Sequence, residues 1–230
     1  MSELTLPLLL QTIDRVSLPV GASFLSDELS IPPATIGRML KAAEDAGYLE
    51  QVSNKGRILT DQGRVFLREA DAAALREQAA KDLISTATSV TPKQLLEILQ
   101  VRRLLEPQTA ALACANATEK DVQTIEDLAF EQVFDIRRGG LGSEQDLQLH
   151  LKLAELSGNA AIYHILKLLL TENSVYIQFS SMSEKMKIQK VTQHDDIVNA
   201  IRARSPEKAA LAMQQHIDRL IDSEKTYAHL

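Results

Sequence analysis

Four residues in the C-terminal half of the chain have types and spacing that could bind one metal ion: Asp146, His150, His194 and His216. Asp146 and His150 are four residues apart in SEQDLQLHLKLAEL, so on a helix both side chains project from one face. His194 opens HDDIVNAI and His216 lies in ALAMQQHIDRLI, each within a helical pattern of its own. Three imidazoles and one carboxylate suit zinc, nickel, manganese or iron. In the alternative interpretation, each residue is a lone polar side chain that caps or lines its helix.

The composition favours a helical protein. The 230 residues suffice for one or two domains, and the 45% hydrophobic fraction includes only 4% aromatic residues, which favours helix over sheet. Cys114 is the single cysteine, so no disulfide can form within the chain, as is typical of a reducing compartment. The sequence shows neither a signal-peptide pattern nor an apolar run of membrane-spanning length. We therefore expect a cytoplasmic protein with no membrane partner.

The first 60 residues have the pattern of a helix-turn-helix followed by a hairpin. The patterns predict helices over residues 4–16, 24–29 and 33–46 and strands over 48–53 and 57–60. Ser23 is the expected N-cap of the second helix, and Gly47 ends the third. A hairpin directly after a helix-turn-helix is a wing, so this is the layout of a DNA-reading domain.

The expected DNA-binding residues lie on the third helix and the wing. A net charge of −6 argues against a general polyanion binder, but the local surface decides DNA contact, and residues 33–68 carry six basic and four acidic side chains. Residues near the start of a recognition helix reach base edges, and wing cations meet phosphates. The predicted contacts are Thr35, Arg38, Lys41, Lys55 and Arg57. In the alternative, the winged helix contacts protein.

A long helical pattern separates this region from a helical C-terminal half. Residues 61–87 are rich in Ala, Glu, Gln and Arg, which we interpret as a linker helix. Thr91 starts a new helix that Pro107 should bend or divide. Later helical patterns predict an antiparallel bundle, whose interior can hold a metal or a small ligand. We therefore predict a mainly α fold, with a winged-helix domain over 1–68, a linker helix over 69–90 and an all-α helical bundle over 91–230.

Three segments of the C-terminal half occur in the order of a known domain: EILQVRRLLEPQTAALACANAT, DLQLHLKLAELSGNAAI and HDDIVNAIRARSPEKAALAMQQHI. Together, over roughly residues 91–223, they resemble the FCD ligand-binding domain of FadR-like members of the GntR transcription-factor family. The resemblance implies that Asp146, His150, His194 and His216 bind a metal.

The N-terminal half resembles a different kind of winged helix. It is similar to winged-helix repressor domains that have PVGA before the second helix, here residues 19–22, and GR-x-x-T-x-x-G after the wing, here Gly56, Arg57, Thr60 and Gly63. The family's usual recognition helix, Ser-Arg-x-x-Val-Arg-x-Ala-Leu, is replaced by PATIGRMLKAAEDAGYL, in which Arg38 alone approaches the pattern. The family's operator sequence and dimer geometry therefore do not carry over.

The resemblance implies a one-component regulator whose affinity for double-stranded operator DNA changes when a small carboxylate enters the bundle. Arg102 aligns with the family's anion-contacting arginine, and a guanidinium offers a fork for a carboxylate. Its neighbour Arg103 cannot face inward as well. Asn173 and Tyr176 could supply further ligand contacts. We expect a homodimer, because two-fold symmetry doubles the DNA contacts of a single winged helix.

Two other functions are compatible with the same residues. His194 and Asp195 form an HD dipeptide, which occurs in helical metal-dependent phosphohydrolases. The order of the remaining residues is wrong for that family, and an enzyme does not explain a winged helix. The second alternative is a metal-free binding module in which the histidines contact the ligand directly.

Overall fold

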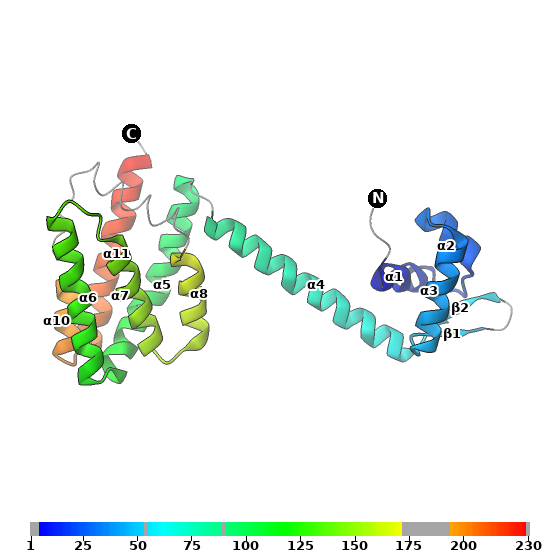
Figure 1. Cartoon of the computed structure of the whole chain (residues 1–230), viewed down its shortest axis with the longest axis horizontal. Coiled ribbons are helices and arrows are strands. Elements are labelled where there is room, and N and C mark those ends of the chain that lie inside the picture. Colours follow the sequence, from blue (N-terminus) through cyan, green and yellow to red (C-terminus); the bar gives the residue numbers. More distant parts are fainter. Residues whose placement is uncertain (1–4, 53–54, 89–90, 172–193, 229–230) are drawn as a thin grey trace. The chain divides into compact units, whose positions relative to one another are not determined.

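The structure, a computed structural model, describes residues 5–52, 55–88, 91–171 and 194–228 (Figure 1). The chain divides into two compact units, Met1–Lys81 and Asp82–Leu230. Among the described residues, no helix is both long enough and apolar enough to cross a membrane.

The N-terminal unit is the predicted winged helix. Its elements are α1 (Leu6–Val16), α2 (Ala22–Leu29), α3 (Pro33–Asp45), β1 (Leu49–Gln51), β2 (Arg57–Leu59) and the beginning of α4 (Asp61–Thr88). The strands pair antiparallel, with Leu49 opposite Leu59. One apolar core joins all of these elements, with Leu9, Leu25, Ile36, Leu40 and Leu59 buried. Burial of these side chains fixes the third helix and the hairpin to one scaffold.

The second helix begins two residues earlier than expected. Its N-cap is Gly21, so Ser23 lies inside the helix and its predicted capping role is wrong. The reason is a long-range contact, because Val20 and Arg57 exchange two backbone hydrogen bonds of 3.0 and 2.9 Å. This bridge holds the chain extended up to Val20, and the helix starts directly after Gly21. Gly47, with φ +79°, follows α3 as predicted.

The GR-x-x-T-x-x-G residues form the base of the wing. A side chain at Gly56 would approach the backbone of Val20 to 2.4 Å, and one at Gly63 would approach the Tyr48 oxygen to 2.2 Å. The Thr60 hydroxyl donates to the Gly47 oxygen at 2.6 Å and accepts from the Gly63 amide at 3.0 Å. The motif therefore fixes the hairpin and the start of α4 against the end of α3.

The described residues of the C-terminal unit form a bundle of α-helices (Figure 1). Its helices are the end of α4 together with α5 (Pro92–Asn116), α6 (Glu119–Arg137), α7 (Ser143–Leu156), α8 (Ala160–Leu170), α10 (Asp195–Arg202) and α11 (Pro206–Ala228). The central helix α5 packs against α11 and α7, while α6 packs against α7 and α10. The shared core includes Leu99, Ile125, Leu149, Ile197 and Met213.

The helix α5 runs through Pro107 without a break, so of the two outcomes expected at Pro107, a bend or a division of the helix, the division is wrong. A proline removes one backbone hydrogen bond. Here the residues around it, Arg102, Glu106, Thr109 and Ala110, are buried, and this packing holds the helix together. The ends of α5 and α6 follow local signals: Thr91 caps α5, and Thr118 with Asp121 forms a capping box at α6.

We predict that Gly63→Ala destabilises the N-terminal unit by about 1–3 kcal/mol, because the new methyl group meets backbone that cannot move aside. Gly37→Ala in α3 is the matched control, since its added methyl group meets no atom within 4 Å. Because alanine favours a helix interior more than glycine does, Gly37→Ala should leave the stability of the N-terminal unit unchanged or raise it. Peptide-resolved hydrogen exchange of the two variants measures the difference, and equal protection of the N-terminal peptides in both would contradict it.

Candidate metal centre

Three helices of the C-terminal unit bring the predicted histidines together. His150 lies on α7, His194 is the N-cap residue of α10, and His216 lies on α11. Their exposed fractions are 1%, 3% and 2%. One ligand nitrogen from each lies within 4.8 Å of the other two. The structure therefore gathers three side chains that are far apart in the sequence into one buried group.

Two hydrogen bonds determine which ring nitrogens face the centre of this group. The Nδ1 atom of His150 bonds to a carboxylate oxygen of Glu106, and Nδ1 of His194 bonds to Oε1 of Gln132 at 2.7 Å. Both partner oxygens accept, so each Nδ1 carries the proton. In the neutral form of each ring, the Nε2 atoms of His150 and His194 then carry lone pairs, and this is the form in which imidazole binds a metal.

These two Nε2 atoms face each other at 3.3 Å. Two lone pairs repel each other unless a cation lies between them. Ligand atoms that are each about 2.1 Å from one ion, at right to tetrahedral angles, are about 3.0–3.4 Å apart. The observed separation fits a shared cation. Nε2 of His216 is buried and has no hydrogen-bond partner in the described part of the chain, so it too can serve as a ligand.

Asp146 completes the predicted set at the edge of the group. Its Oδ1 atom is 3.3 Å from Nε2 of His194, and its Oδ2 atom is 4.0 Å from Nε2 of His150. The Gln132 side chain donates to the same Oδ1 atom at 3.1 Å. Gln132 therefore orients both His194 and Asp146.

His194 and His216 are neutral at pH 7. Burial lowers the pKa of His194 to about 4, although the negative charge of Asp146 opposes the shift. Burial also lowers the pKa of His216 well below its usual value, and the other two histidines lower it further. Because metal binding requires unprotonated imidazole, a cation at this site would not have to displace protons from these two rings at neutral pH.

Sequence reasoning missed Glu106 and Gln132. One oxygen of Glu106 accepts from Nε of Arg102 at 2.5 Å, and the other contacts His150. Burial would raise the pKa of Glu106, but the charge of Arg102 and the hydrogen bonds from His150 and Arg102 outweigh it and lower the pKa to about 2. The spacing of Arg102 and Glu106, one helical turn, was an available signal. Gln132 had none, because its contacts are formed only in the tertiary structure.

Of the three residues predicted to bind the small acid, the structure describes one, Arg102. Arg102 is buried, whereas Arg103 is half-buried and pairs with Asp218 at 2.5 Å, so only one of the two neighbours faces inward, as expected. Asn173 and Tyr176 lie outside the described residues.

The predicted DNA contacts lie on one helix and the wing. Arg38 and Lys55 are exposed, and the Arg38 guanidinium is 3.4 Å from the Thr35 hydroxyl. Lys41 pairs with Asp45 at 2.7 Å. Arg57 is less accessible, because its guanidinium pairs with Glu44 of α3 at 3.0 Å. A DNA phosphate could therefore bind Arg57 only beside Glu44 or by displacing Glu44 from it.

Comparison with known proteins agrees with this architecture. The family model for the FCD domain matches residues 97–219. LutR of Bacillus subtilis, an HTH-type transcriptional regulator, is 26% identical over 203 residues, covering 86% of this chain and 87% of LutR. The Exu regulon transcriptional regulator of Escherichia coli is 26% identical over 204 residues, covering 85% of this chain and 71% of that protein.

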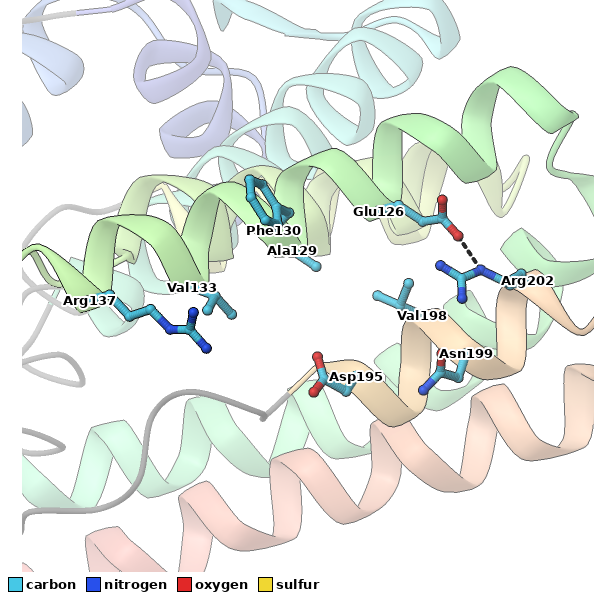
Figure 2. Close-up of a pocket in the computed structure, with 9 residues that line it drawn as sticks. All are labelled: Glu126, Ala129, Phe130, Val133, Arg137, Asp195, Val198, Asn199 and Arg202. Carbon is cyan, nitrogen blue, oxygen red and sulfur yellow. Dashed lines mark hydrogen bonds and ion pairs between the residues drawn. The ribbon is translucent and has the colours of Figure 1, made fainter.

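Solved structures show the same fold. McbR/YncC of Escherichia coli has a TM-score of 0.52 at 14% identity, covering 98% of this chain and 99% of that chain. Lar of Listeria monocytogenes has a TM-score of 0.53 at 12% identity with the same coverage. Because these relatives are transcriptional regulators, the hydrolase alternative is wrong. Asp195 of the HD dipeptide lines a surface groove together with Phe130 (Figure 2). The chain belongs to the FCD-domain family of GntR-type transcriptional regulators and is not an enzyme.

Proposed function

We propose that this regulator binds a divalent transition metal (zinc, nickel, manganese or iron) in its helical domain and senses a small organic acid beside it. The observation that carries this proposal is the approach of two proton-free Nε2 atoms within a buried group of three histidines. His150, His194, His216 and Asp146 would hold the ion. Such an ion supplies positive charge and open positions for an oxygen donor.

The charges of the site favour an anionic ligand. A divalent cation and Arg102 carry three positive charges together, while Glu106 and Asp146 supply two negative charges. One positive charge is left in a buried environment, where an uncompensated charge is costly. A monocarboxylate would neutralise it. Arg102 already holds Glu106 with its Nε atom, and its planar fork allows more than one oxygen partner.

We infer that the winged helix reads operator DNA as part of a homodimer. Thr35, Arg38 and Lys41 would face bases, and Lys55 with Arg57 would face the backbone. We propose domains over 1–68 and 91–230, with the helix over 69–90 between them. Side chains 71–85 are exposed throughout, so this stretch of α4 depends on helix propensity and local pairs such as Glu77–Lys81. The acid must bind one arrangement of the domains better than another to change DNA affinity.

We predict that His150→Ala lowers the metal content of the purified protein and weakens metal binding by at least about tenfold, since one direct ligand is lost and Glu106 loses one of its two partners. His164→Ala is the matched control, because His164 is exposed on α8 outside the centre. Elemental analysis and metal titration of both variants provide the measurement. Equal metal content in His150→Ala and the parent would refute the assignment.

We predict that Arg38→Ala reduces discrimination between a selected duplex and random DNA by about tenfold or more, as expected for loss of a base contact. Lys55→Ala should instead weaken both complexes alike and reduce the slope of log affinity against log salt by about one. Titration of both duplexes at several salt concentrations separates the two roles. An equal loss in both duplexes for Arg38→Ala would place that residue on the backbone.

We predict that Arg102→Lys weakens binding of the recognised acid by roughly tenfold, since lysine keeps the charge but loses the fork. Arg103→Lys changes the neighbouring residue in the same way and should leave acid binding unaltered. Calorimetric titration of a panel of small carboxylates into the metal-loaded proteins gives the comparison. If no acid binds the parent, or if both variants bind as the parent does, the sensing proposal is refuted.

A further inference from the structure

Helix α6 presents two large aromatic side chains to solvent. Phe130 is 71% exposed and Phe134 is 52% exposed, and their rings stack with centroids 6.5 Å apart. Asp127 precedes them on the same face and Arg137 follows, both exposed. We call these four residues the α6 stripe. Their spacing of three, four and three residues is the heptad spacing of a helix that packs along another helix.

The stripe continues into a groove of mixed polarity between α6 and α10 (Figure 2). Phe130 and Arg137 belong to both features. The rest of the lining is apolar at Ala129, Val133 and Val198 and polar at Glu126, Asp195, Asn199 and Arg202. Its volume is about 450 Å³. Exposed aromatic side chains with polar and charged groups around them are typical of a surface that binds protein.

The charges of the stripe are arranged symmetrically about its aromatic pair. Asp127 lies three residues before Phe130, and Arg137 lies three residues after Phe134. Among the described residues neither forms an ion pair, although the Gln123 amide donates to Asp127 at 2.8 Å. They are separated by about 15 Å along the helix, too far to pair within one chain. The stripe is therefore complementary to a second copy of itself placed antiparallel.

We propose that the α6 stripe is the dimer interface of the helical domain, with α6 of two chains packed antiparallel about a two-fold axis. Asp127 then lies opposite the partner's Arg137, and Phe130 lies opposite the partner's Phe134. Each contact then occurs twice, once in each direction between the two chains, as an isologous interface requires. The proposal rests on the homodimer of the proposed function and identifies the surface that forms it. A different protein partner would not need charges mirrored about the aromatic pair.

The test is a charge exchange between the two ends of the stripe in the full-length protein. Asp127→Arg and Arg137→Asp should each raise the dimer Kd by more than about tenfold, because each variant places like charges opposite each other twice. An equimolar mixture of the two variants should dimerise again, since both charge pairs are then opposite in sign. Mass photometry and sedimentation equilibrium over a dilution series measure the Kd.

Leu104→Asp is the matched control, because Leu104 is 74% exposed on α5, away from the stripe. It should leave the dimer unchanged. Dimers of parent strength in both single variants, or weakened variants that fail to recover when mixed, would overturn the proposal. Loss of the dimer in Leu104→Asp alone would place the interface on α5. Metal content and DNA affinity, measured on the same samples, test the proposed function separately. A parent protein that binds metal and DNA as a monomer would refute both the interface and the proposed homodimer, whereas a parent dimer that both single variants leave at full strength would refute only the interface.

Discussion

The 3.3 Å approach of the Nε2 atoms of His150 and His194 is the contact around which the helical domain is arranged. The two Nε2 atoms face each other because the Nδ1 atom of each ring already forms a hydrogen bond, that of His150 with Glu106 and that of His194 with Gln132. Helices α5 and α6 therefore orient the histidine side chains that α7 and α10 carry. Separating an ion such as Glu106 from water costs several kcal/mol unless it is paired, and Arg102 with His150 provides that pairing. A cation between the rings would convert their repulsion into attraction.

Most of the fold could be predicted from the sequence because its signals are local. Thr91 and Thr118 mark two helix starts by their own hydrogen bonds, and the apolar spacing gave the helices of both units. Two predictions, the start of the second helix and the division of α5 at Pro107, were wrong because tertiary contacts overrode the local signals. The bridge between Val20 and Arg57 moved the start of α2, and packing on both sides of α5 carried that helix through Pro107.

The candidate site could be predicted only as far as residue type and pattern allow. Histidines at helical positions are visible in a sequence, as is a carboxylate one turn away. Glu106 and Gln132 were missed because a residue that orients a ligand has no required spacing from it. The same limit affected the wing: the positive charge of Arg57 was visible, but its pairing with Glu44 depends on how the hairpin folds back on α3.

The most direct test of the metal centre is a crystal structure of the purified protein with anomalous data collected on both sides of the absorption edge of the bound metal. We expect one anomalous peak about 2.1 Å from Nε2 of His150, His194 and His216, with Asp146 at the same ion. Nδ1 of His150 should still contact Glu106. Absence of a peak in protein exposed to zinc, nickel, manganese and iron, or a peak bound through the Nδ1 atoms, would contradict the arrangement described here.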